Sequence, residues 1–246
     1  MDQLEWWISN MQYFGGKQRI SKPLSEYINK NLQDEQPFVD LFCGSCNIIS
    51  KIKGNRTKIA NDKHRYLINM WKELQNGWIP PQQISREEYT YIKENKDNKP
   101  HLTGFVGFGC SFAGKWFGGY ATSNSRNYCL NAYNSSLSKL RYLRDVEFLN
   151  LNYDEVDIPK GSLVYCDIPY RGTTQYCRNE VGIFNHNEFY NWVKNNSDTY
   201  DIYISEYKDN VPDGFEIVWE LESKKDIRNK NNERVKTTEV LIKYKK

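Results

Sequence analysis

The residues best suited to chemistry follow a short apolar run at Leu163–Cys166, where the chain reads Asp167-Ile168-Pro169-Tyr170. An exocyclic amine on a planar heterocycle is a poor nucleophile, because its lone pair is delocalised into the ring. A carboxylate oxygen and a backbone carbonyl that accept its two hydrogens hold the nitrogen and favour a pyramidal geometry, while an aromatic ring stacks on the heterocycle. The pattern predicts a site for a base-like substrate. The plain alternative is a strand end with a turn proline and a packed tyrosine.

A second strand end, upstream, has the same design. Residues Phe38–Phe42 form an apolar run that contains Asp40 and is followed by Gly44. A buried carboxylate is costly unless donors satisfy it, so Asp40 requires backbone amides or a cationic ligand nearby. Gly44 allows the backbone to approach a ligand closely. About twenty residues after this turn, Asp62 ends another short run, at the spacing that places a carboxylate on a ribose in nucleotide-binding units; its alternative role is to cap the next helix.

Strand-like and helix-like segments alternate along the chain, which predicts an α/β fold with a mainly parallel sheet and right-handed crossovers. Strands are expected at 38–42, 58–62, 146–151, 163–166, 201–205, 215–219 and 239–244, and helices at 20–31, 65–75 and 85–94, with another opening near Asn47. The basic segment 224–236, between the last two strands, is predicted to be a loop.

A change of composition marks an inserted lobe at residues 77–144. Pro80-Pro81 breaks the pattern, a charged helix follows, and residues 104–136 are rich in Gly, aromatic residues, Ser and Asn. We therefore expect residues 1–76 and 145–246 to form one domain into which the lobe is inserted.

Bulk composition limits the class of protein. With 34 Lys and Arg against 31 Asp and Glu the formal net charge is +3, so any nucleic-acid surface must be a local patch. The six Cys include only one closely spaced pair, Cys43 and Cys46, and the three His are scattered, so no metal site is expected. Cysteines in apolar segments are typical of a reduced, cytoplasmic protein, and no apolar run approaches the ~20 residues of a membrane span.

Five motifs in this order resemble the DNA N6-adenine methyltransferases of the Dam type, the D12 class, which includes phage-borne members. The motifs are Tyr13-Phe14-Gly15-Gly16-Lys17, the segment 38–44, Asn61-Asp62, the Asp167–Tyr170 segment and Ile204-Ser205-Glu206-Tyr207. The resemblance spans nearly the whole chain. It implies a Rossmann-like S-adenosylmethionine-dependent sheet of seven strands, with an inserted, mainly helical DNA-recognition lobe. It also implies methyl transfer to N6 of an adenine flipped out of duplex DNA, with GATC as the family's common target.

The resemblance assigns roles to individual residues. The implied catalytic residues are Asp167, Ile168, Pro169 and Tyr170, and the implied cofactor-binding residues are Tyr13, Gly15, Lys17, Asp40, Phe42, Gly44, Asp62, Asn152, Tyr153 and Asp167. Tyr13 and Lys17 resemble residues that line the methionine end of the donor, Asp40 the acid near its ammonium, and Asp62 the ribose ligand. Tyr153 would lie beside the donor's adenine.

Two residues depart from the family pattern. Asn152 stands where an acid commonly reads the donor's adenine amine, although an amide oxygen still accepts a hydrogen bond. Ile168 stands where the family has a proline, and it supplies the backbone carbonyl without a fixed φ. A catalytically impaired DNA-binding homologue is therefore an alternative, and an N4-cytosine methyltransferase is another, because cytosine presents a comparable amine.

The inserted lobe carries the expected DNA contacts. Positive charge interleaved with rings and Gly suits phosphate contact, groove reading and filling the gap left by an extruded base. The residues are Lys115, Trp116, Tyr120, Arg126 and Tyr128. The alternative is a Gly-rich loop that packs its aromatic residues on the lobe. The expected partner is double-stranded DNA, the expected location the cytoplasm of a bacterial or phage-infected cell, and the expected state a monomer.

Overall fold

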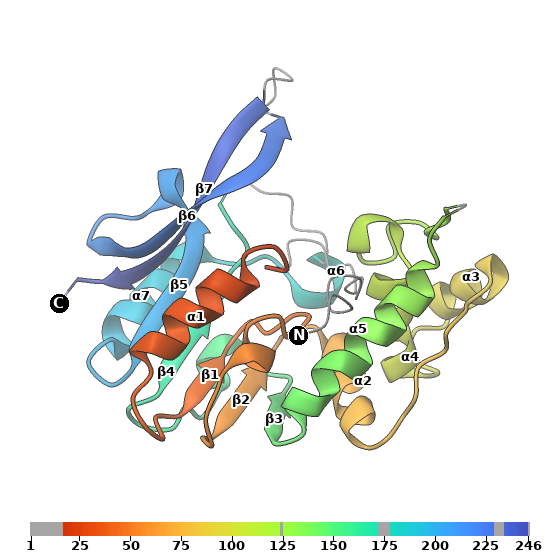
Figure 1. Cartoon of the computed structure of the whole chain (residues 1–246), viewed down its shortest axis with the longest axis horizontal. Coiled ribbons are helices and arrows are strands. Elements are labelled where there is room, and N and C mark those ends of the chain that lie inside the picture. The colour runs from red at the N-terminus through yellow and green to blue at the C-terminus, as the bar shows by residue number, and fades with distance from the viewer. Residues whose placement is uncertain (1–16, 124, 172–177, 229–233, 246) are drawn as a thin grey trace, which may run out of the picture.

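A seven-stranded sheet forms the centre of the molecule (Figure 1). The structure is a computed structural model that describes residues 17–123, 125–171, 178–228 and 234–245. The strands are β1 (Phe38–Asp40), β2 (Lys58–Asn61), β3 (Val146–Leu149), β4 (Leu163–Cys166), β5 (Asp201–Tyr207), β6 (Phe215–Arg228) and β7 (Arg234–Tyr244). Their order is β3-β2-β1-β4-β5-β7-β6. The first five strands of this order pair in parallel, whereas β7 pairs antiparallel with β5 and with β6. The predicted α/β, Rossmann-like class is confirmed.

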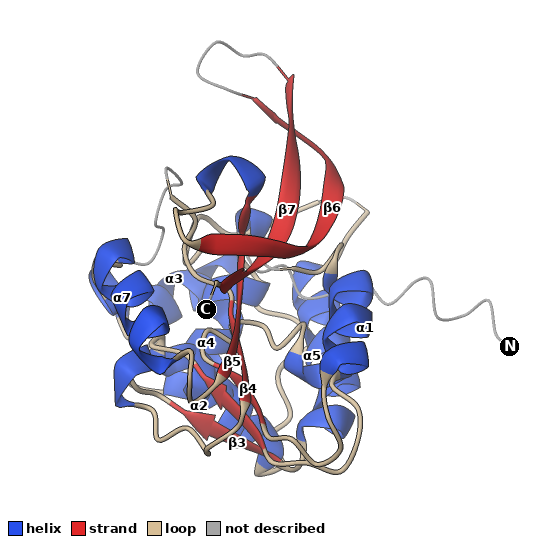
Figure 2. Ribbon diagram, turned by 90° about the vertical axis from the view of Figure 1, so that its left-hand side faces the viewer, coloured by secondary structure: helices blue, strands red, loops and turns tan. Residues whose placement is uncertain are grey.

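Helices cover both faces of this sheet (Figure 2). The described helices are α1 (Ser21–Asn31), α2 (Arg65–Gln75), α3 (Arg86–Glu94), α4 (Pro100–Gly109), α5 (Tyr128–Leu143), α6 (Arg178–Val181) and α7 (His186–Asn196). Short 3-10 turns are η2 (Ile49–Lys51), η3 (Phe112–Gly114), η4 (Tyr153–Glu155) and η5 (Lys208–Asn210). Alternate strand residues separate into two core clusters: Phe38 and Tyr165 pack with α1, α2 and α5, whereas Val39 and Val164 pack with α7. This alternation is the period of two that a sheet buried on both faces requires.

Two expectations about the chain were wrong. The helix predicted near Asn47 is only the 3-10 turn η2. Gly44 and Cys46 both have positive φ, which is incompatible with starting a helix in this loop. The segment 224–236, predicted as a loop, continues β6 to Arg228 and begins β7 at Arg234. The two strands form a long hairpin that rises above the rest of the sheet (Figure 2).

The region predicted as an inserted lobe contains α3, α4 and α5, between β2–α2 and β3. The charged helix is α3, which begins with the predicted polar signal: Ser85 and Glu88 form a reciprocal capping box. Helix α4 packs against α2 at very short range, since a Cβ on Gly104 would lie 2.1 Å from the Tyr66 carbonyl oxygen. The mainly helical character of this region is thus observed, and its bounds as a domain remain a prediction.

Candidate active site

Three carboxylates lie at one edge of the sheet, because parallel strands place their carboxyl ends together. Asp40 ends β1, Asp62 follows β2 and Asp167 follows β4. Lys17, which precedes α1, sends its ammonium into this edge, where Nζ lies 3.0 Å from Oδ1 of Asp167. The same Nζ lies 3.1 Å from Oε2 of Glu239 on β7. Burial alone would lower the pKa of Lys17, but the two carboxylates outweigh it and raise the pKa above its ordinary value. Lys17 is therefore a buried cation shared by two acids.

Glu239 also fixes the ring of Tyr170. The Tyr170 hydroxyl donates a hydrogen bond of 2.6 Å to Oε2 of Glu239, and the Lys17 ammonium lies 4.1 Å from the centre of the Tyr170 ring. The edge of Tyr207 packs against the same ring, with 4.4 Å between centroids. Sequence reasoning missed Glu239, because it lies on the last strand without a recognisable motif; its register opposite Tyr207 brings it to the carboxyl edge.

Asp40 is buried and incompletely paired. Its side chain accepts hydrogen bonds from the backbone of Phe42 and Ile49, whereas Oδ1 has no hydrogen-bond partner within the described part of the chain. Burial, followed by the nearby charge of Asp167, raises its pKa well above the ordinary value, against the lowering effect of those backbone donors. A buried carboxylate oxygen without a partner fits a cationic group of a ligand.

Asp62 organises the turn after β1. Its two oxygens accept from the backbone N–H groups of Gly44, at 3.0 Å, and His64, at 2.8 Å. Burial raises its pKa to about 6 against these two hydrogen bonds, and Asp167 raises it further. Gly44 adopts φ +47° and Cys46 φ +57°, so the turn bends sharply at two positions. The alternative role of Asp62 as the N-cap of the next helix is wrong, because His64 is the N-cap of α2 and Asp62 bonds to the backbone N–H of that residue.

Helix α5 reaches the same turn through a buried lysine. Lys139 Nζ donates to the carbonyl oxygen of Ser45 at 2.7 Å and to Oδ1 of Asn47 at 2.8 Å. Burial lowers the pKa of Lys139 to about 7; the neighbouring Cys46 raises it and Lys51 lowers it. The predicted lobe is thereby tied to the turn after β1, a contact that the sequence did not indicate.

Aromatic rings surround the end of β1 on the other face of the sheet. The ring of Phe42 packs against Tyr153, Phe184 and Phe189 with centroids 5.7 to 5.9 Å apart. Asn152, whose backbone N–H bonds to Glu155 at 2.9 Å, directly precedes Tyr153. Phe42 and Tyr153, both predicted to bind the cofactor, are therefore neighbours, and Phe184 and Phe189, which were not predicted, belong to the same aromatic cluster.

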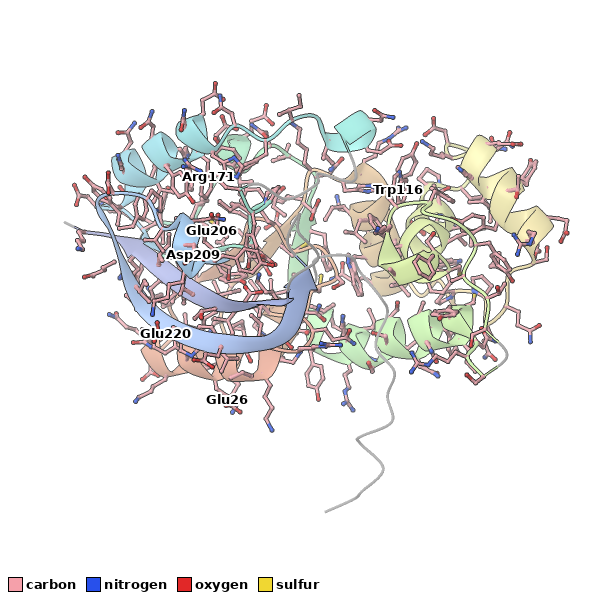
Figure 3. The ribbon with its side chains drawn as sticks, turned by 90° about the horizontal axis from the view of Figure 1, so that it is seen from above. Glu26, Trp116, Arg171, Glu206, Asp209 and Glu220 are labelled. Atoms are coloured by element: carbon pink, nitrogen blue, oxygen red, sulfur yellow. The ribbon has the colours of Figure 1, made fainter. Side chains whose placement is uncertain are left out.

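The predicted DNA-binding residues separate into packed and accessible side chains. The Trp116 ring packs on His64, Phe108 and Phe117, and its indole N–H bonds to Glu180 of α6 at 3.3 Å. Tyr120 packs on Tyr89 and donates to the Ile84 carbonyl at 2.7 Å. Lys115 and Tyr128 are half-buried and Arg126 is exposed. Phe112, which was not predicted, is 63% exposed on the same loop. Figure 3 places Trp116 within the lobe, away from Arg171 and Glu206.

Tyr13 and Gly15 lie outside the described residues. In the described ranges, no three His, Cys, Asp or Glu side chains are arranged to hold a metal ion. None of the described helices is both long and apolar enough to cross a membrane.

Comparison with known proteins supports the resemblance on which the site residues were assigned. Residues 13–106 match the model of the family described as D12 class N6 adenine-specific DNA methyltransferase. This range contains the motifs from Tyr13 to Asp62, so the predicted resemblance to the D12 class is confirmed there. The matched range ends before the Asp167–Tyr170 segment.

Among solved structures, one similar chain is SMU.472, described as a candidate methyltransferase complexed with SAH. The TM-score is 0.37 and the sequence identity 12%; the match covers 94% of this chain and 55% of that one. The chain thus spans about half the length of that structure. No curated protein matches this sequence.

Proposed function

We propose that this protein transfers a methyl group from S-adenosylmethionine to N6 of an adenine flipped out of duplex DNA. The observation that carries the proposal is the cluster at the carboxyl edge, where Asp167 follows β4 beside Tyr170 and the shared cation Lys17. An acceptor beside an aromatic ring is the arrangement that an exocyclic amine requires. The match to the adenine-specific family over residues 13–106 favours adenine over cytosine.

Different residues at the carboxyl edge of the sheet would bind different parts of the donor. The unpaired oxygen of Asp40 suits the ammonium of the donor's methionine part, and Asp62 the ribose hydroxyls. Phe42, Asn152 and Tyr153 would lie at its adenine, and Tyr13, Gly15 and Lys17 near its methionine end. When bound, S-adenosylmethionine supplies a methyl group on a positively charged sulfur.

The acceptor side rests on Asp167 and the backbone carbonyl of Ile168. They would accept the two hydrogens of the adenine amine, while Tyr170 stacks on the base. In the structure the ammonium of Lys17 forms ion pairs with Oδ1 of Asp167 and with Glu239. When the adenine amine binds Asp167, Lys17 would therefore keep Glu239 as a partner. Duplex DNA would contact the lobe through Arg126, Lys115 and Tyr128, with the exposed Phe112 nearby, whereas the packed Trp116 and Tyr120 would support this surface from within.

The test is the identity of the methylated base. The protein is incubated with methyl-labelled S-adenosylmethionine and three duplexes: one containing GATC, one with adenine in other contexts, and one without adenine. We expect labelled N6-methyladenine from an adenine-containing duplex and no label in the adenine-free one. N4-methylcytosine would establish the cytosine alternative, and binding of duplex without any product would establish the non-catalytic one. Methylation of the GATC duplex but not of the duplex with adenine in other contexts would identify GATC as the target sequence. We expect the protein to act as a monomer, in the cytoplasm.

A further inference from the structure

The Asp167–Tyr170 segment, which would hold the adenine, has Ile168 at a position where a proline ring would fix the backbone angle φ. Ile168 lies between Asp167 and Pro169. A residue before proline is confined to extended conformations, so Pro169 restricts the ψ of Ile168 and with it the direction of the Ile168 carbonyl. The φ of Ile168 remains free, whereas a proline there would hold it near −65°. Contacts from the rest of the protein must supply the missing restraint.

Three sets of contacts converge on this segment. The Ile168 side chain is only 2% exposed and packs in the core cluster that contains α7. Nε2 of His186, the first residue of α7, lies 2.7 Å from the carbonyl oxygen of Pro169. Because a carbonyl can only accept, Nε2 must carry the proton in this bond. The ring of Phe184 packs edge-on against His186, with 5.0 Å between centroids, and limits its rotation.

The other end of the segment is held by β5 and η5. The carboxylate of Glu206 is fully buried, and its Oε1 accepts from the backbone N–H of Tyr207 at 2.8 Å, while the backbone N–H of Arg171 lowers its pKa. The Asn210 amide donates to Oε1 of Glu206 at 3.1 Å and to the Arg171 carbonyl at 3.3 Å. The backbone of Arg171, the residue after Tyr170, is thus held by Asn210 of η5 and lies against the carboxylate of Glu206 on β5. Figure 3 shows Arg171, Glu206 and Asp209 on the same part of the molecule.

We propose that His186, with Glu206 and Asn210, forms a clamp that positions the Asp167–Tyr170 segment and replaces the restraint that Ile168 does not provide. This inference rests on the proposed function of that segment. His186 is a positioning residue: it holds the backbone next to the carbonyl that would accept the adenine amine, and it does not touch the substrate in this account. Glu206 and Asn210 do the same beyond Tyr170.

The test combines His186 variants with a proline at position 168. In the His186→Ala variant, we expect kcat to fall roughly 10- to 100-fold on the duplex that the wild type methylates, because a displaced acceptor misaligns the amine. The KM for duplex should stay within about twofold, since the proposed duplex contacts lie on the lobe and not on the clamp. The His186→Gln variant keeps an amide donor and should recover most of the rate. His101→Ala, which removes a histidine from α4, is the matched control and should leave kcat unchanged.

The decisive comparison is rescue. Ile168→Pro restores the backbone restraint, so His186→Ala should cost less than about threefold in that background. If the wild type methylates DNA but His186→Ala retains full kcat, or costs the same with and without the proline, the inference is overturned.

A second readout does not depend on catalysis. Amide hydrogen exchange in residues 163–171 should be faster in His186→Ala than in the wild type and should return toward the wild-type rate in Ile168→Pro, His186→Ala. Unchanged exchange in His186→Ala overturns the inference even if the protein methylates DNA. If the wild type methylates no duplex, the proposed function fails, while the exchange rates still decide whether the clamp exists.

Discussion

At the scale of single residues, the turn after β1 contains a carboxyl group whose charge is sensitive to pH. Burial raises the pKa of Asp62 to about 6, although the backbone N–H groups of His64 and Gly44 favour its charged form. A ribose hydroxyl binds the carboxylate better than the protonated acid, so donor binding needs the deprotonated form. Affinity for SAH should therefore be full above pH 7 and fall as the pH decreases through about 6.

Calorimetric titration with SAH between pH 5 and 8 checks this prediction. The Asp62→Asn variant should bind SAH more weakly at pH 8 and lose the step near pH 6. A step of the same size in Asp62→Asn would assign it to another group, of which the buried Asp40 is the nearest candidate.

Glu239 offers a second prediction at this scale, because it holds both Lys17 and Tyr170. In Glu239→Gln the amide oxygen still accepts the Tyr170 hydroxyl, but the negative charge is lost, so Lys17 binds Asp167 more tightly and competes with the adenine amine. We expect kcat to fall about tenfold, equivalent to about 1.4 kcal/mol of barrier. Steady-state kinetics on the duplex that the wild type methylates measures the fall in kcat. Glu220→Gln on β6 is the control. An unchanged kcat would mean that the charge of Glu239 has no part in catalysis.

At the scale of elements, the contact between α2 and α4 depends on the absence of a side chain at one position. A Cβ on Gly104 would lie 2.1 Å from the Tyr66 carbonyl oxygen and 2.7 Å from its carbon, which are backbone atoms that cannot move alone. Gly104→Ala should therefore lower the free energy of unfolding by at least about 3 kcal/mol, despite the better helix propensity of Ala. Denaturant titration measures the loss. Asn69→Ala, on the exposed face of α2, should stay within about 0.5 kcal/mol, and an equal effect of both would contradict the close approach.

Some elements and site residues could be predicted from the sequence, and others could not. Strands such as Leu163–Cys166 were predictable, because short apolar runs that end in turn residues carry a local signal. The hairpin of β6 and β7 was underestimated, since Lys and Asn at its end resemble a loop while the strands are held by pairing with each other. Asp40, Asp62 and Asp167 were found because each directly follows or ends a strand. Glu239, Lys139 and His186 were not, because their roles arise from register and helix packing over long sequence separations.

At the scale of the whole molecule, the net charge of +3 leaves DNA binding to local patches. Arg126 is exposed in the predicted lobe. The predicted lobe contacts α6, because Lys96 and Trp116 both donate to Glu180. Arg126→Ala should weaken duplex binding and reduce the slope of log affinity against log salt by about one.

Fluorescence anisotropy with a labelled duplex at several salt concentrations measures this slope. Arg141→Ala is the control, since Arg141 is also exposed but lies near the C-terminal end of α5, whereas Arg126 precedes its first residue. Equal slopes for Arg126→Ala and the wild type would remove Arg126 from the DNA-binding surface.

The proposed methyl transfer depends on the carboxylate of Asp167, which would hold the amine that receives the methyl group. The most direct measurement is the single-turnover rate of methyl transfer for the wild type and Asp167→Ala, with the duplex and the donor both saturating. We predict a wild-type rate at least about 100-fold higher, as expected when one aligned acceptor is removed, with the affinity for duplex changed by less than about threefold. Equal rates for the two proteins would contradict the account.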